Sequence, residues 1–137
     1  MLPRILADTN VLISALISPQ GSPGRLLAMF RDGVFELLGS PKLLNELIGV
    51  LMRPKFRTYV TPVEARRYAV WLRHAASLVH DPEDVPTASP DPGDDFLIAV
   101  ARAARATYLV SGDRHLIDLE EADPPVLTPA ALLERLS

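Results

Sequence analysis

Short apolar runs alternate along this chain with longer stretches whose apolar residues recur at helical spacing. The short runs show no polar alternation and are bounded by Gly, Asp, Ser or Pro, which is typical of strands buried on both faces. They predict strands over 4–7, 35–38, 107–110 and 126–127, with a further short strand near 77–80. The longer stretches predict helices over 10–17, 23–32, 41–52, 62–76, 95–105 and 129–136.

This alternation predicts an α/β fold, a three-layer α/β/α sandwich with a central, mainly parallel sheet covered by helices on both faces. The 137 residues fit a single domain, 1–137, and 48% of them are hydrophobic, which is enough for a core. Ligands bind such folds beyond the carboxyl ends of the strands. The residues that directly follow each strand are therefore the first candidates for a site.

Prolines support the predicted helix starts. A good capping residue stands directly before a proline at Ser22-Pro23, Ser40-Pro41, Thr61-Pro62 and Thr128-Pro129. Proline fits the first helical position, since its missing N–H has no partner there in any case. Glu64 follows Thr61 by three residues and predicts a capping box.

Several classes of protein are excluded by composition. No stretch approaches the roughly 18 apolar residues that cross a bilayer, and the N-terminus lacks the layout of a signal peptide. We therefore expect a cytoplasmic protein with no membrane partner. The absence of cysteine excludes disulfides and thiolate metal sites, so any metal must be held by oxygen or imidazole.

The net charge of −3 hides a strong local asymmetry. Residues 80–95 hold six acidic residues and no Lys or Arg, whereas residues 53–73 hold six basic residues and one acid. The average alone argues weakly against a nucleic-acid partner. The distribution instead predicts an acidic region set against a basic one.

Acidic residues stand where such a fold collects functional groups. Asp8 and Asp113 each follow a predicted strand, Asp94 and Asp95 open a predicted helix, and Glu46 lies close to the apolar face of another. Each has a structural alternative: Asp8 and one of the adjacent pair as helix caps, Asp113 as a turn residue, Glu46 as a solvent-facing side chain. Because all of them stand where such a fold collects functional groups, a common functional site is indicated more strongly than separate structural roles.

Like charges gathered in one cleft must either take up protons or hold a cation. With oxygen ligands alone, the expected ion is Mg²⁺ or Mn²⁺. Ions held in this way activate a water and stabilise the charge that develops on a phosphodiester under attack. The chemistry indicated is hydrolysis of nucleic acid.

Four motifs in this order resemble the PIN-domain family, and closely its bacterial VapC-like toxin components. They are ADTNVLISAL, SPKLLNELIGVLMRPKFR, DPGDDFLIAVA and YLVSGDRHL, and the resemblance continues to LTPAALLERL. It implies a PIN-like fold and a Mg²⁺- or Mn²⁺-dependent endoribonuclease, the toxin of a type II toxin–antitoxin system. It also implies a homodimer, an RNA substrate and a cognate antitoxin.

Site residues carry over from the family by motif. The resemblance implies a catalytic and metal-binding quartet of Asp8, Glu46, Asp95 and Asp113. Asn10, Asp94 and Ser111 would support it.

One departure concerns the segment before the third acid. Similar sequences often read Asp-Pro-Asp-Asp-Asp where this chain has glycine at position 93. The missing acid removes a negative charge from this segment and motivates an alternative function, a non-catalytic PIN-like domain that binds RNA or protein.

The basic stretch has two interpretations. It is either a solvated helix face or a rim that contacts RNA phosphates and guides the strand toward the acids. The candidates for RNA binding are Arg53, Lys55, Arg57, Arg66 and Arg73.

Overall fold

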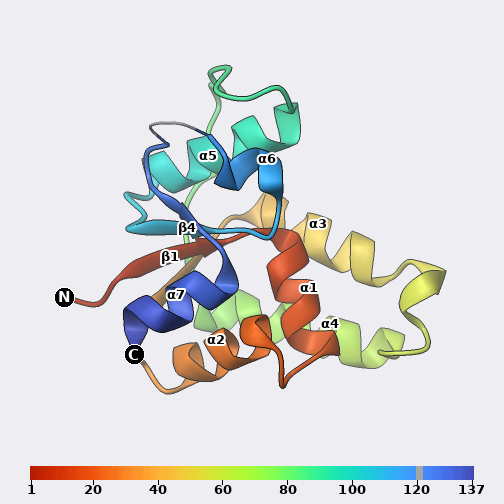
Figure 1. The fold of residues 1–137 in the computed structure, drawn as a ribbon. Coiled ribbons are helices and arrows are strands. Elements are labelled where there is room, and N and C mark those ends of the chain that lie inside the picture. Colours follow the sequence, from red (N-terminus) through yellow and green to blue (C-terminus); the bar gives the residue numbers. More distant parts are fainter. Residues whose placement is uncertain (120–121) are drawn as a thin grey trace.

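A five-stranded parallel sheet forms the centre of the computed structural model, which describes residues 1–119 and 122–137 (Figure 1). The strand order is β3-β2-β1-β4-β5. The strands are β1 (Arg4–Ala7), β2 (Glu36–Gly39), β3 (Ser77–Leu78), β4 (Tyr108–Val110) and β5 (Val126–Leu127). The order reverses at β1, the central strand, which pairs with β2 on one side and β4 on the other.

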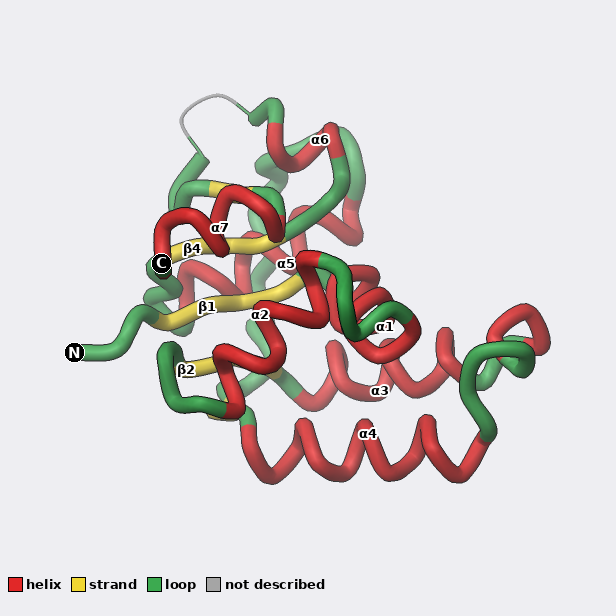
Figure 2. Tube along the Cα trace, turned by 60° about the horizontal axis from the view of Figure 1, so that its bottom comes forward, coloured by secondary structure: helices red, strands yellow, loops and turns green. Residues whose placement is uncertain are grey.

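Helices cover both faces of this sheet. They are α1 (Thr9–Ile17), α2 (Ser22–Arg31), α3 (Pro41–Leu51), α4 (Pro62–Ala75), α5 (Pro92–Ala103), α6 (Arg114–Ile117) and α7 (Pro129–Leu136), with a 3-10 turn at Pro54–Phe56. Helices α5 and α6 pack on one face and the others on the opposite face, as Figures 1 and 2 show. The three-layer α/β/α sandwich expected from the sequence is confirmed.

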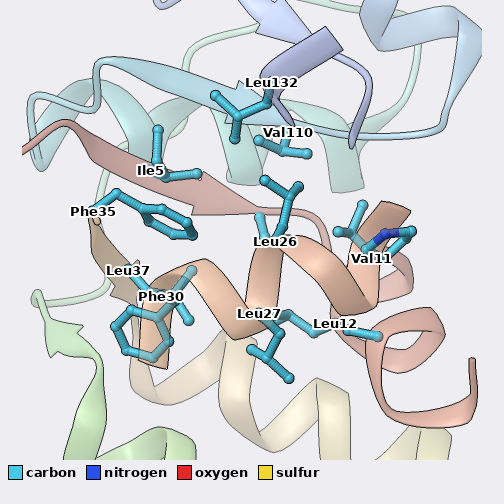
Figure 3. A pocket seen from close by; sticks show the side chains of 13 residues that line it. Ile5, Val11, Leu12, Leu26, Leu27, Phe30, Phe35, Leu37, Val110 and Leu132 are labelled. Carbon is cyan, nitrogen blue, oxygen red and sulfur yellow. The ribbon is translucent and has the colours of Figure 1, made fainter. Parts of the chain in front are cut away.

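Two apolar cores follow from the alternation of side chains along the strands. Ile5 and Val110 face the layer of α1, α2, α3, α4 and α7, whereas Leu6 and Leu109 face α5 and α6. The first core includes an apolar pocket lined by the sheet, α1, α2 and α7, shown in Figure 3. Its free volume of about 20 Å³ is too small for a ligand, so the pocket is a packing gap.

Helix α1 starts at Thr9 rather than 10, and three further helices differ from the sequence-based expectations. Helix α5 starts at Pro92 rather than 95, with Asp91 as its cap. Helix α2 is capped by Gly21 and takes Ser22 into its first turn. Helix α6 was not expected, because four residues are too few to show a periodicity.

Helix α4 is tied to α1 by a buried phenol. The Tyr68 hydroxyl donates to the Leu12 carbonyl at 2.7 Å. Burial raises the pKa of Tyr68 well above its usual value, with a smaller opposing effect from the Arg31 charge. The hydrogen bond holds α4 against α1.

No helix in the described part of the chain is long and apolar enough to cross a membrane.

Two helical glycines predict opposite stability changes on substitution by alanine. A Cβ on Gly24 would lie 2.1 Å from the Pro19 carbonyl oxygen, whereas a Cβ on Gly49 would meet nothing within 4 Å. Gly24→Ala must therefore displace backbone, and we expect it to destabilise the protein by roughly 2 kcal/mol or more. Gly49→Ala should instead raise the free energy of unfolding by about 0.5–1 kcal/mol through helix propensity.

Urea unfolding of both variants beside the parent measures the two changes. A Gly24→Ala variant as stable as the parent would contradict the close approach of α2 to the preceding turn.

Candidate active site

The site begins where β1 and β4 end side by side. Ala7 pairs with Val110, and the Asp8 amide donates to the Val110 carbonyl at 2.8 Å. The next residue on each strand therefore reaches the same edge of the sheet. There the buried Ser111 hydroxyl donates to Oδ2 of Asp8 at 2.9 Å.

Ser111 also orders Asp113, a second acid at this edge of the sheet. Its Oγ accepts the Asp113 amide at 3.0 Å, so one hydroxyl links Asp8 to the backbone of Asp113. Both aspartates cap helices. Oδ1 of Asp8 accepts the Asn10 amide at 3.4 Å at the start of α1, and Oδ1 of Asp113 accepts the His115 amide at 2.9 Å at the start of α6.

Asp94 comes to the same place from the first turn of α5. It is 9% exposed, and its buried Oδ2 has no hydrogen-bond partner among the residues that the structure describes. Burial, together with the negative charges of Asp113, Asp91 and Asp8, raises the pKa of Asp94 to about 6, against a smaller opposing effect of His115. The structure therefore brings Asp8, Asp94 and Asp113 within electrostatic reach of one another.

Asp95 turns to a different environment. Its Oδ1 accepts the Ala88 amide at 2.8 Å and the Ser89 hydroxyl at 2.9 Å. The Ala88 N–H chiefly holds the pKa of Asp95 below its usual value. The family resemblance implies Asp95 as a member of the quartet and Asp94 as its support. The structure places Asp94 near Asp8 and Asp113, and one oxygen of Asp95 bonds to the preceding segment.

Glu46 and Asn10 are both exposed, and neither side chain bonds to Asp8, Asp94 or Asp113 among the described residues. Glu46, on α3, is exposed and makes none of the side-chain hydrogen bonds or ion pairs found in the described residues, which agrees with the alternative of a solvent-facing side chain. Asn10 contributes its backbone N–H to Asp8. Among residues 1–119 and 122–137, no three His, Asp or Glu side chains lie in position to hold a metal as they stand.

The basic residues divide into two kinds. Arg53, Lys55, Arg66 and Arg73 are exposed. Arg57 instead folds back, and its guanidinium donates to the Leu51 carbonyl at the end of α3. Arg57 therefore serves as a helix-end donor rather than a free phosphate contact.

Sequence reasoning missed the cap of α5, although the signal was present. Asp91 stands directly before Pro92 and accepts the Gly93 amide at 2.8 Å, the same arrangement of capping residue and proline used to predict other helix starts. Reading that signal would have started the helix earlier and moved both following acids into its first turn.

The donors present suit a hard divalent cation. Three carboxylates and a hydroxyl offer only oxygen, which Mg²⁺ and Mn²⁺ prefer. The unpaired buried Oδ2 of Asp94 is a lone acceptor in a negative environment, and a cation would satisfy it.

Comparison with known proteins gives the family. A family model of the PIN domain matches residues 4–115. The chain belongs to the PIN domain family. PIN domains are generally nucleases and generally use divalent metal ions, which agrees with the oxygen donors of the site.

A relative and two solved structures resemble this PIN domain. The uncharacterized protein MJ1680 of Methanocaldococcus jannaschii is 30% identical over 118 residues, covering 86% of this chain and 76% of its own length. PAE2754 from Pyrobaculum aerophilum superposes with a TM-score of 0.64 at 16% identity, over 98% of this chain and 89% of the other.

VapBC2 from Rickettsia felis, bound to a DNA fragment from its promoter, gives a TM-score of 0.62 at 13% identity, over 91% of this chain and 98% of the other. At these identities the two structures show that the PIN fold is shared.

The raised pKa of Asp94 predicts a pH-dependent gain in stability for Asp94→Asn without metal. A carboxyl whose pKa rises from 3.8 to about 6 on folding disfavours the folded state most above pH 6 and not at all well below pH 4. In EDTA at pH 8 the variant should therefore be more stable by on the order of 2 kcal/mol. This advantage should disappear as the pH falls below 4.

Urea unfolding at pH 8, 6 and 4 measures this difference, with Asp84→Asn as a control at an exposed position. A variant no more stable than the parent at pH 8 would contradict the electrostatic crowding of Asp94.

Proposed function

We propose that this PIN domain is a Mg²⁺- or Mn²⁺-dependent endoribonuclease and the toxin of a type II toxin–antitoxin system. The convergence of Asp8, Asp94 and Asp113, with one buried carboxylate oxygen left unpaired, carries the proposal. Holding like charges together costs free energy unless a cation offsets it. Residues 1–137 would form one catalytic domain.

The proposed ligands of the cation are Asp8, Glu46, Asp95 and Asp113, and Asp94 would add a further carboxylate beside Asp8 and Asp113. Glu46 has an exposed side chain on α3 with no hydrogen bond among the described residues, so its carboxylate is available. When bound, the cation would lower the pKa of a water and offset the charge developing on the phosphodiester.

The protein's own residues prepare this site. The Ser111 hydroxyl donates to Oδ2 of Asp8, and the Asn10 amide donates to Oδ1, so the carboxylate is oriented before any ligand arrives. The Asp113 carboxylate is oriented in the same manner by the His115 amide. Asp94 supplies the buried oxygen, and its ionised form is the one that a cation would favour.

Likeness to the Rickettsia felis VapBC2 structure supports the proposed antitoxin partner. A cognate antitoxin would inhibit the nuclease, and the active form would be a homodimer acting on RNA in the cytoplasm.

A second candidate function is a non-catalytic PIN domain that binds RNA or protein. The observation that favours it is that no three acids in the described residues stand ready to hold a metal. Titration calorimetry with MnCl₂ separates the candidates, because the nuclease binds Mn²⁺ and the non-catalytic domain does not.

Asp8→Asn should abolish metal-dependent cleavage while leaving the fold intact. The amide oxygen can still cap α1, but the charge that would face the cation is lost. We expect the rate to fall by about 100-fold or more, since each loss of about 1.4 kcal/mol of transition-state stabilisation is a factor of ten. A fluorescently labelled single-stranded RNA with added MnCl₂ or EDTA measures cleavage.

Asp32→Asn, at an exposed residue after α2, is the matched control and should cleave as the parent does. Cleavage that persists in EDTA, and in the Asp8→Asn variant, would refute the proposed mechanism.

The exposed basic residues of α4 are proposed to contact RNA. Arg66 and Arg73 are seven positions apart and exposed, which places them on one face of the helix. Their joint substitution by alanine should weaken RNA binding and reduce the magnitude of its salt slope by about 1.4 for two lost phosphate contacts. Fluorescence anisotropy in EDTA, at several salt concentrations, measures this without cleavage.

Arg25→Ala, at an exposed position on α2, controls for the general loss of positive charge. An unchanged salt slope in the double variant would show that this helix face is merely solvated.

A further inference from the structure

The turn between α3 and α4 presents an aromatic side chain to solvent. Tyr59 is 63% exposed, and its hydroxyl takes part in none of the side-chain hydrogen bonds found in the described residues. The other two tyrosines are engaged, because the Tyr68 hydroxyl donates to a carbonyl of α1 and the Tyr108 hydroxyl accepts from Arg135. Internal contacts therefore account for those two rings and not for the ring of Tyr59.

The backbone holds this turn in one conformation. The Tyr59 and Val60 amides both donate to the Phe56 carbonyl, at 3.0 Å and 2.9 Å. Val60 is 3% exposed and anchors the end of the turn in the first core. The Arg57 guanidinium ties the turn to the end of α3. An aromatic ring on such a support has few torsions left to order when it binds a ligand.

The same turn carries positive charge that no neighbouring acid in the sequence offsets. No Asp or Glu stands between Glu46 and Glu64, whereas Arg53 and Lys55 are both exposed. The Lys55 ammonium lies 5.1 Å from the centroid of the Phe56 ring. The ion pair found in the described residues lies on β1 and β2, so it involves neither cation. Such a surface complements a polyanion.

Helix α3 connects this turn to the candidate active site. Leu6 pairs with Leu38 in the parallel sheet. Two residues further along each strand, Asp8 and Ser40 therefore reach the same edge, and Ser40 caps α3. The 11 residues of α3 then lead about 16 Å to the turn, which projects beyond α3 and α4 in Figures 1 and 2. A strand bound at the acids can continue along α3 to Tyr59.

We propose that Tyr59 is a stacking platform for an unpaired base of the RNA, with Arg53 and Lys55 contacting the neighbouring phosphates. The inference rests on the proposed function, because it takes RNA as the ligand, and it narrows the substrate class to RNA with unpaired nucleotides. Aromatic rings stack on the bases of single strands, whereas the bases of a duplex are already stacked on one another. Tyr59 would bind the substrate at a distance from the scissile bond.

The charge around Tyr59 favours a nucleic acid over a protein partner. Lysine is depleted in the buried cores of protein interfaces, where its charge would have to leave water. Phosphates instead favour Arg and Lys side chains, and such contacts position a nucleic acid without reading its sequence. An exposed ring among unpaired cations therefore suits a single strand of RNA.

Substitutions of Tyr59 separate stacking from the other contributions. Tyr59→Phe keeps the ring and removes only the hydroxyl, so the affinity for single-stranded RNA should be unchanged. Tyr59→Ala removes the platform and should lower this affinity roughly tenfold, as the loss of one contact between a base and an aromatic ring does. Val85→Ala, at an exposed apolar residue between β3 and α5, is the matched control and should bind as the parent does.

Three RNA probes identify the group that Tyr59 contacts. They are a fluorescently labelled single strand of about 12 nucleotides, the same strand without its bases, and the same strand paired with its complement. Fluorescence anisotropy in EDTA measures the affinities without metal-dependent cleavage. The loss in Tyr59→Ala should appear only with the intact single strand, because the other two probes offer no free base face.

Equal affinities of the parent and Tyr59→Ala for the single strand would overturn the inference and would favour a protein partner for this turn. An equal loss with the abasic strand would overturn it as well, since the ring would then not act through a base. Absence of RNA binding by the parent would overturn both the inference and the RNA substrate. Binding without cleavage in MnCl₂ would instead remove the proposed nuclease, while the variants would still decide the role of Tyr59.

Discussion

The parallel pairing of β1 with β4 is the constraint on which the rest of the site depends. Because Ala7 lies opposite Val110, the two chains leave the sheet at the same level, and Ser111 meets Asp8 there. Slipping this pairing by one residue would turn the apolar side chains of β4 to the opposite faces and carry Ser111 away. Core packing and the geometry of the acids are therefore fixed together.

Crowded carboxylates oppose this arrangement, and the protein offsets the repulsion in several small ways. Asp8 and Asp113 receive N–H groups at the starts of α1 and α6. Asp94 lies in the first turn of α5, where the partial positive charge of a helix start favours an anion. Oδ2 of Asp94 still has no hydrogen-bond partner among the described residues, so the repulsion at this atom is only partly offset.

The layered fold could be predicted because its signals are local. Apolar runs mark the strands, and capping residues before prolines mark helix starts such as Thr61-Pro62, where the capping box is present. The short helix α6 has too few residues for any periodic signal. The start of α5 was predictable as well, because Asp91 is a capping residue directly before Pro92.

The different hydrogen bonding of the adjacent Asp94 and Asp95 could not be predicted from composition or family motif alone. It depends on where α5 begins and on donors from Ala88 and Ser89, six or seven residues away along the chain. Arg57 is a similar case: its sequence neighbours indicate a basic surface, but its guanidinium ends on a backbone carbonyl. The partners of a single side chain depend on tertiary contacts, which cannot be deduced from the pattern of residue types along the chain.

The hydrogen bonds already made by Asp8 and Asp113 have a consequence for ion exchange. Both oxygens of Asp8 and one of Asp113 each accept one protein donor, so three of the roughly eight lone-pair sites of these two carboxylates are already engaged. A small divalent ion there would keep much of its hydration shell, as Mg²⁺ commonly does. Such an ion would exchange readily with solvent, so occupancy would follow the free divalent-ion concentration of the surroundings.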